Sequence, residues 1–209
     1  MDENPYAAPR VDLVEDAGPR QMNGWTPGNL RLLGWLSLVS AVGTLVITGF
    51  AVAAGVTEDP RLVSVSDWIG VALTFLGCYL LIRFKLFAEA RFSAEGLAPP
   101  IWAVIVVSLG IEVLDLLMGD ASTEPGWPML LYFGVIALLG ALTAWFGIRL
   151  LKVQNVYPVF RVMAWLDLVG GIMMATIVLM MLGLLPLIAS SVAMMLVFFR
   201  GARELEPSA

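Results

Sequence analysis

Three carboxylates stand inside apolar segments of this chain, where an acidic side chain is costly. Glu112 and Asp115 lie three residues apart in the run from 99 to 118, and Asp167 stands in the run that begins near residue 159. On a helix, a spacing of three puts two side chains on one face. A carboxylate in hydrocarbon costs at least about 2.5–3.5 kcal/mol, so such residues pair with a partner or serve a function. These three are the candidate functional residues.

Glu112 and Asp115 would lie near the outer end of their helix. Counting back from Met118 at about 1.5 Å per residue places Glu112 about 9 Å and Asp115 about 5 Å from that end. One interpretation is a proton or cation site that faces a cavity. The other is a polar outer mouth, or a hydrogen bond between helices.

Asp167 would lie about 12 Å along its helix from the cytoplasmic start. At a similar depth, guanidinium groups from Arg83 or Arg149 could reach inward, and buried membrane charges commonly pair. We therefore predict an ion pair between Asp167 and one of these two arginines. The alternative makes Asp167 the inner station of a proton path whose outer station is Glu112.

The sequence excludes several kinds of chemistry. It has no His and a single Cys, Cys78, so it lacks the commonest metal ligand and general base. It contains no Gly-rich phosphate loop or nucleophile elbow, and no basic patch interleaved with aromatic residues for nucleic acid. We expect no catalytic residue, no cofactor and no metal site.

Composition identifies the class of protein that must hold these carboxylates. Of the 209 residues, 59% are hydrophobic and 14% charged, and the mean hydropathy is +0.87. Soluble domains are about 45–50% apolar and about 25% charged. The chain is therefore predicted to span a lipid bilayer as an all-α bundle.

The apolar runs predict six transmembrane helices in three hairpins. Their expected ranges are 30–56, 67–87, 99–118, 127–151, 159–182 and 184–199. Asp67 is the expected N-cap of the second helix. The last two helices come from one apolar stretch of about 60 Å, twice the bilayer thickness, with its expected turn at Gly183-Leu184-Leu185-Pro186. Residues 1–28 are expected to form a disordered tail and residues 201–209 a short second tail.

The positions of the cations predict orientation. Of the 12 Lys and Arg residues, all but Arg61 lie beside the same ends of the predicted helices. The side richer in Lys and Arg is cytoplasmic. Both termini are then expected in the cytoplasm.

Two of the predicted helices begin alike. The segment from Arg31 to Ser40 aligns without gaps on Arg161 to Gly170, and both hold Trp-Leu four residues after the Arg. The two hairpins also end alike, in Phe87-x-x-Ala90-Arg91 and Phe199-x-x-Ala202-Arg203. One interpretation is a duplication of the first and third hairpins. The other is that every helix entering from the cytoplasm uses an Arg and a Trp.

The N-terminal tail carries one recognisable motif, Asn4-Pro5-Tyr6-Ala7-Ala8-Pro9. This motif resembles the tail found on many uncharacterised small multi-span inner-membrane proteins of Gram-negative bacteria. The resemblance implies a location in the bacterial inner membrane and no particular activity.

Two functional hypotheses follow. The first is a non-enzymatic membrane protein that contacts itself or a membrane-protein partner through helices. Small residues four apart, Gly140 with Ala144 and Gly171 with Ala175, favour close helix approach and motivate it. The second is a small proton-coupled transporter or channel that uses Glu112, Asp115 and Asp167.

Overall fold

The computed structural model describes residues 22, 24–57, 60–118 and 126–206, and the Asn4 to Pro9 motif lies outside them. In the described part, the chain forms six α-helices and one short 3-10 turn and no strand. The elements are α1 (Pro27–Thr57), α2 (Pro60–Phe92), α3 (Ala98–Met118), α4 (Trp127–Leu151), α5 (Pro158–Ala175), η2 (Ile177–Leu179) and α6 (Met180–Glu204).

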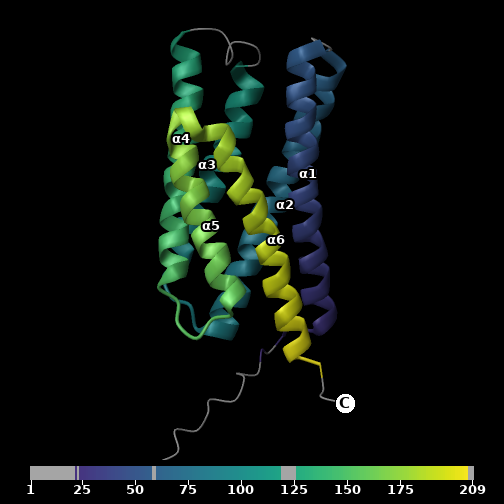
Figure 1. Cartoon of the computed structure of the whole chain (residues 1–209), viewed down its shortest axis with the longest axis vertical. Coiled ribbons are helices and arrows are strands. Elements are labelled where there is room, and N and C mark those ends of the chain that lie inside the picture. The colour runs from purple at the N-terminus through teal and green to yellow at the C-terminus, as the bar shows by residue number, and fades with distance from the viewer. Residues whose placement is uncertain (1–21, 23, 58–59, 119–125, 207–209) are drawn as a thin grey trace, which may run out of the picture.

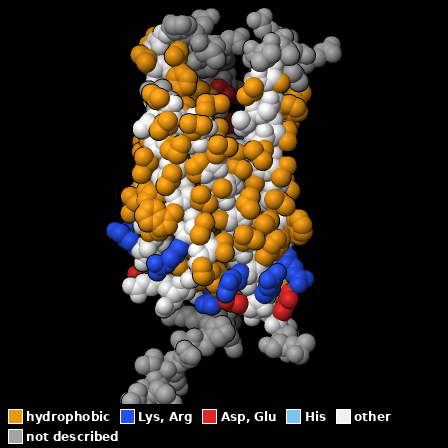
Figure 2. Space-filling model, viewed as in Figure 1, with side chains coloured by type: hydrophobic (Ala, Val, Ile, Leu, Met, Phe, Trp, Pro, Cys, Tyr) orange, Lys and Arg blue, Asp and Glu red, His pale blue; other side chains and the backbone are white. Residues whose placement is uncertain are grey.

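The prediction of an all-α, six-helix membrane bundle is confirmed. Six helices are long and apolar enough to cross a bilayer. They lie side by side along the long axis of the molecule, and α1 begins at the same end at which α6 finishes (Figure 1). The face drawn in Figure 2 is largely apolar along the middle of the bundle, as contact with lipid requires.

The bundle has two chemically different ends. Lys and Arg side chains gather at the lower end in Figure 2. We call this the basic end; it is where Arg31 begins α1 and where Arg91, Arg149 and Arg203 finish α2, α4 and α6. The opposite end, where α3 finishes and α4 begins, we call the far end.

The turn between the last two helices does not lie where the sequence predicted. Helix α5 ends at Ala175, Thr176 adopts an extended backbone, and η2 leads directly into α6. The predicted turn at Gly183–Pro186 is wrong, because both residues lie inside α6. Gly183 serves packing instead: a Cβ there would stand 2.8 Å from the Met174 backbone nitrogen.

Other predicted boundaries also shift. Helix α2 begins at Pro60, so Asp67 lies within the helix and is not its N-cap; proline suits a first helical turn because its missing N–H needs no partner there. At the termini, Pro27 and Gly28 belong to α1 and residues 201–204 belong to α6. Met22, placed in the predicted disordered tail, is 5% exposed and packs in the core.

Helices α4 and α5 touch through their backbones. A Cβ at Gly140 would lie 2.5 Å from the Ala175 nitrogen, and one at Gly171 would lie 2.4 Å from the Ala144 nitrogen. Without side chains in the way, the two helices gain dispersion contacts along their whole length, which drive helix association in lipid. This contact sets the position of α5, and therefore of Asp167.

At the basic end, the helices converge on a cluster of phenylalanines. Phe84 of α2 stacks on Phe160 of α5 with ring centroids 5.6 Å apart and meets Phe198 of α6 edge-on at 6.2 Å. All three rings are fully buried. The cluster therefore ties the first hairpin to the third, and Phe146 of α4, with its ring centroid 6.4 Å from that of Phe84, adds the second.

The two similar helix beginnings occupy equivalent environments. Buried positions recur at the same spacing, namely Leu30, Leu33, Gly34, Ser37 and Ala41 in α1 and Phe160, Met163, Ala164, Asp167 and Gly171 in α5. Trp35 and Trp165 are 58% and 57% exposed. The hairpin ends do not match in the predicted register, because Phe87 is fully buried and Phe199 only half-buried.

We expect Gly140→Ala to lower the free energy of unfolding by about 1–3 kcal/mol, because the added methyl group forces the α4 and α5 backbones apart. Reversible unfolding in mixed detergent micelles measures the change. The matched control is Gly134→Ala on the same helix, where a Cβ meets nothing within 4 Å. The control should keep or gain stability, up to about 1 kcal/mol. Equal losses in both variants would contradict the close contact.

Candidate functional site

A cavity of about 200 Å³ lies between all six helices, next to Asp167. We call it the central cavity. Its polar lining consists of one carboxylate and five hydroxyls, from Ser37 and Ser40 of α1, Thr143 of α4, Asp167 of α5, and Ser190 and Ser191 of α6. Its apolar lining includes Leu80 of α2 and Val104 of α3. A site of this size and polarity can hold a few water molecules or a small ion.

Among the residues that the structure describes, Asp167 is the one acidic side chain that lines the central cavity. The residue is 7% exposed, and its carboxylate accepts a hydrogen bond from the Ser190 hydroxyl. The second carboxylate oxygen, Oδ2, is buried and has no hydrogen-bond partner. A buried anion with one donor and no cation is far from compensated. A proton or a cation in the cavity would supply the positive charge that the protein does not provide.

The predicted ion pair with Arg83 or Arg149 does not form. The Arg83 guanidinium lies over the Trp25 ring, 4.7 Å from its centroid, and Arg149 Nε donates to the Gly96 carbonyl at 3.1 Å. Arg149 is thus satisfied by a loop carbonyl at the basic end, whereas Arg83 has an aromatic face and a buried Nε without a hydrogen-bond partner. The ion pairs of the described residues do not include Asp167.

Glu112 and Asp115 lie above this cavity, toward the far end. The Thr74 hydroxyl of α2 donates to Glu112 Oε1 at 2.5 Å, and Asp115 shares a hydrogen bond with the Tyr132 hydroxyl of α4. Glu112 is half-buried and contacts α2, whereas Asp115 is exposed and contacts α4. The structure does not bring either of them to Asp167.

A line of small and polar residues connects the two levels. On α3, Val104, Ser108, Glu112 and Asp115 share one face, since they are spaced by four, four and three. On α2, Thr74 and Gly77 lie opposite this face, and we call the contact region between α2 and α3 above the cavity the seam. A Cβ added at Gly77 would have no neighbouring atom within 4 Å. About 12 Å of helix separates Val104 from Glu112.

The first two helices separate from the next two toward the far end. In Figure 1, α1 and α2 stand apart from α3 and α4 in the upper part of the molecule. Figure 2 shows acidic side chains inside a hollow at that level.

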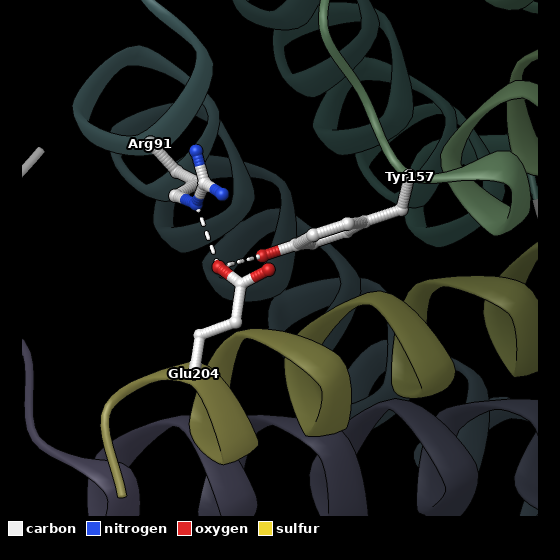
Figure 3. A network of polar contacts seen from close by, with 3 residues as sticks. All are labelled: Arg91, Tyr157 and Glu204. Atoms are coloured by element: carbon white, nitrogen blue, oxygen red, sulfur yellow. Dashed lines mark hydrogen bonds and ion pairs between the residues drawn. The ribbon is translucent and has the colours of Figure 1, made fainter. Parts of the chain in front are cut away.

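The opposite end is closed by polar contacts beneath the phenylalanine cluster. Glu204 Oε2 accepts from Arg91 Nε at 2.8 Å and from the Tyr157 hydroxyl at 2.6 Å (Figure 3). The three residues come from α2, the α4–α5 loop and α6. Burial and the bond to Glu204 raise the pKa of the Tyr157 phenol, so it stays a neutral donor at any physiological pH. This network joins α2, α6 and the loop that connects the second hairpin to the third.

Sequence reasoning missed the hydroxyls of the central cavity. Single serines and threonines are common in apolar runs, and their spacing along the sequence did not indicate that these five would meet. One signal was available: in the alignment of the two helix beginnings, Ser37 falls on Asp167. Both side chains are buried and line the same cavity, so the alignment paired two cavity positions.

Comparison with family models, curated proteins and solved structures finds no match to this chain. Within the described ranges, no group of three His, Cys, Asp or Glu side chains could hold a metal ion. The functional assignment therefore depends on the geometry of the central cavity and the seam above it.

We expect Asp167→Asn to raise the free energy of unfolding by about 1 kcal/mol, because the amide keeps the shape and removes an uncompensated buried charge. Unfolding in mixed micelles tests this. Glu89→Gln is the control; its surface pair with Lys85 lies within one helix, and its loss should change stability by less than about 0.5 kcal/mol. A marked loss of stability in Asp167→Asn would instead identify Asp167 as a structural residue.

Proposed function

We propose that this membrane protein is a small proton-coupled transporter or channel and that Asp167 is its proton-binding group. The observation that carries the proposal is that Asp167, which lines a polar cavity, has a buried Oδ2 atom without a hydrogen-bond partner. Stable bundles avoid such groups, so an intramembrane acid of this kind is best explained by function.

The seam above the cavity supports a route for the proton. Glu112 and Asp115 line the way from the far end, and Glu112 is already hydrogen-bonded to a hydroxyl, Thr74. Chains of carboxylates, hydroxyls and water pass protons along by successive hydrogen bonds. In this arrangement Glu112 is the outer station and Asp167 the inner one, and water in the seam bridges the distance between them.

The packed basic end favours a mechanism of alternating access and disfavours a permanently open pore. The phenylalanine cluster and the Arg91–Glu204–Tyr157 network lie between the central cavity and the basic end. A proton at Asp167 would reach that side only when these contacts separate. Neutralising Asp167 removes the charge that favours an open, wet far side, which would bias the bundle toward the other arrangement.

Association with a partner through small-residue faces has less support. The residues that motivated it, Gly140, Ala144, Gly171 and Ala175, contact one another inside the chain. Their close approach already forms the α4–α5 contact, so they are not available to a second protein. We therefore favour transport over a role based on these helix faces.

Proton movement into proteoliposomes tests the proposal. A potassium diffusion potential drives protons inward, and a trapped pH-sensitive dye reports them. We expect the unmodified protein to acidify the interior faster than protein-free vesicles do, Asp167→Asn to fall to the protein-free rate, and Glu112→Gln to be several-fold slower.

Glu89→Gln is the matched control, because it removes one carboxylate that lines neither the cavity nor the seam. It should leave the rate unchanged. A pH-difference infrared spectrum provides a readout that needs no solute: a carboxyl C=O band should be present and should be missing in Asp167→Asn. Equal rates in all variants, together with an unchanged spectrum, would reject the proposal.

We further propose that the protein resides in a bacterial inner membrane with its basic end in the cytoplasm. The gathering of Lys and Arg at that end supports this orientation, and the tail motif from Asn4 to Pro9 supports the compartment by resemblance. The transported proton would then arrive from the outer side, through the far end.

Reporter fusions check the orientation. A phosphatase that is active only outside the cytoplasm should be active after Gly126, which precedes α4, and inactive after Asn155, in the α4–α5 loop. A fluorescent protein that matures only in the cytoplasm should give the opposite result. The reverse pattern would overturn the orientation and place the far end inside the cell.

A further inference from the structure

The last two turns of α6 carry a stripe that changes from apolar to basic along the helix. Leu196, Phe199, Arg200 and Arg203 are spaced by three, one and three residues, so they share one face. Leu196 is exposed, Phe199 half-buried, and both arginines are exposed. The apolar part of the stripe lies toward the middle of the membrane and the basic part at its surface.

Two grooves meet along this stripe. One, of about 340 Å³, lies between α1 and α6 and is lined by Arg31, Trp35, Phe199, Arg203 and Glu206. The other, of about 550 Å³, lies between α5 and α6 and is lined by Val159, Leu196, Phe199, Arg200, Arg203 and Glu204. Phe199 and Arg203 belong to both. Figure 2 shows the basic side chains gathered over the lower ends of α6 and α1.

Phe199 forms a fixed wall between the grooves. Its ring packs on Gly34 of α1, where a Cβ would stand 2.6 Å from the ring, and it meets the Trp35 ring edge-on at 5.7 Å. The grooves are therefore shaped by packed aromatic groups and not by mobile surface side chains alone.

The charge of the grooves is not balanced. Glu206 pairs with Arg31, and Glu204 is held by Arg91 and Tyr157. Arg200 lies over the Tyr157 ring at 5.3 Å, a contact that leaves its charge in place. Among the residues that the structure describes, neither Arg200 nor Arg203 takes part in an ion pair. Two positive charges thus remain, next to apolar walls.

We infer that these grooves bind an anionic phospholipid of the leaflet at the basic end. The guanidinium groups of Arg200 and Arg203 would hold the phosphate, because Arg offers paired donors that match phosphate oxygens. Basic pockets between transmembrane helices are the usual sites for such head groups. The acyl chains would run along Leu196, Phe199 and Trp35, which already face the hydrocarbon.

The apolar walls distinguish a lipid from a soluble anion. A free phosphate would use only the arginines and would leave the upper part of each groove empty. A phospholipid fills both parts, and it is present at high local concentration wherever α6 meets the membrane surface. The inference is independent of proton transport, since none of these residues lines the central cavity.

Binding of short-chain lipids to the purified full-length protein in a neutral detergent tests the inference. Native mass spectrometry counts the bound molecules and gives affinities. We expect dioctanoyl phosphatidylglycerol to bind at least about tenfold more tightly than dioctanoyl phosphatidylcholine, and the Arg200→Gln/Arg203→Gln double variant to lose that preference. Millimolar inorganic phosphate should not displace the lipid.

Two further variants keep the test decisive. Lys152→Gln/Arg161→Gln removes two charges from the same end, away from both grooves, and should keep the preference. Arg200→Lys/Arg203→Lys retains the charge but not the paired donors, so it should keep the preference for phosphatidylglycerol at lower affinity. It replaces the glutamine variant if that variant fails to fold. Equal loss in the two glutamine pairs would show a general charge effect, and displacement by phosphate would show a soluble-anion site; either result overturns the inference.

Discussion

The backbone contact between α4 and α5 is the constraint on which the other features depend. In lipid, apolar side chains gain nothing by leaving the solvent, so helices hold together only where their surfaces fit closely. Gly140 and Gly171 allow that fit, and Gly183 extends it to α6. Because α5 is fixed on two sides, Asp167 has no freedom to turn toward lipid or toward the basic end. The close approach at Gly140 and Gly171 therefore fixes the position of the Asp167 carboxylate in the wall of the cavity.

The two halves of the bundle differ in how they are filled. Toward the basic end, rings of phenylalanine occupy the interior and a three-residue polar network covers them. Toward the far end, Thr74 of α2 and Glu112 of α3 meet through a hydrogen bond, and α1 and α2 stand apart from α3 and α4 (Figure 1). Large rings exclude water and small polar groups admit it. The polarity of the molecule along its long axis thus follows from which side chains the six helices place at each level.

Much of this architecture could be predicted from the sequence, and the failures have physical causes. Apolar length and cation placement predict six helices, because the bilayer fixes the length of a span and the cost of a charge within it. The turn after α5 was misplaced because glycine and proline were expected to break the helix at Gly183 and Pro186. The chain uses that glycine for helix packing, and the helix ends before Thr176. Ile177 and Val178 follow, and such a β-branched run weakly disfavours helix.

The central cavity could not be predicted from the sequence, since its hydroxyls come from separate helices with no shared spacing. Asp167 was singled out by the cost of a charge in lipid, and the partner expected for it was wrong because Arg83 lies over the Trp25 ring and Arg149 bonds the Gly96 carbonyl.

Pro186 has a mechanical consequence for α6. Proline has no amide hydrogen, so the carbonyl of Leu182, one turn earlier, lacks the hydrogen bond that would stiffen the helix at this level. On one side of this point Gly183 is pressed against α5, and on the other Ser190 holds Asp167. The helix is thus most compliant between its anchored first turn and the turn that carries the cavity hydroxyls. A small bend there would swing the remaining length of α6 as a lever, with its greatest displacement at Glu204, about 27 Å of helix away.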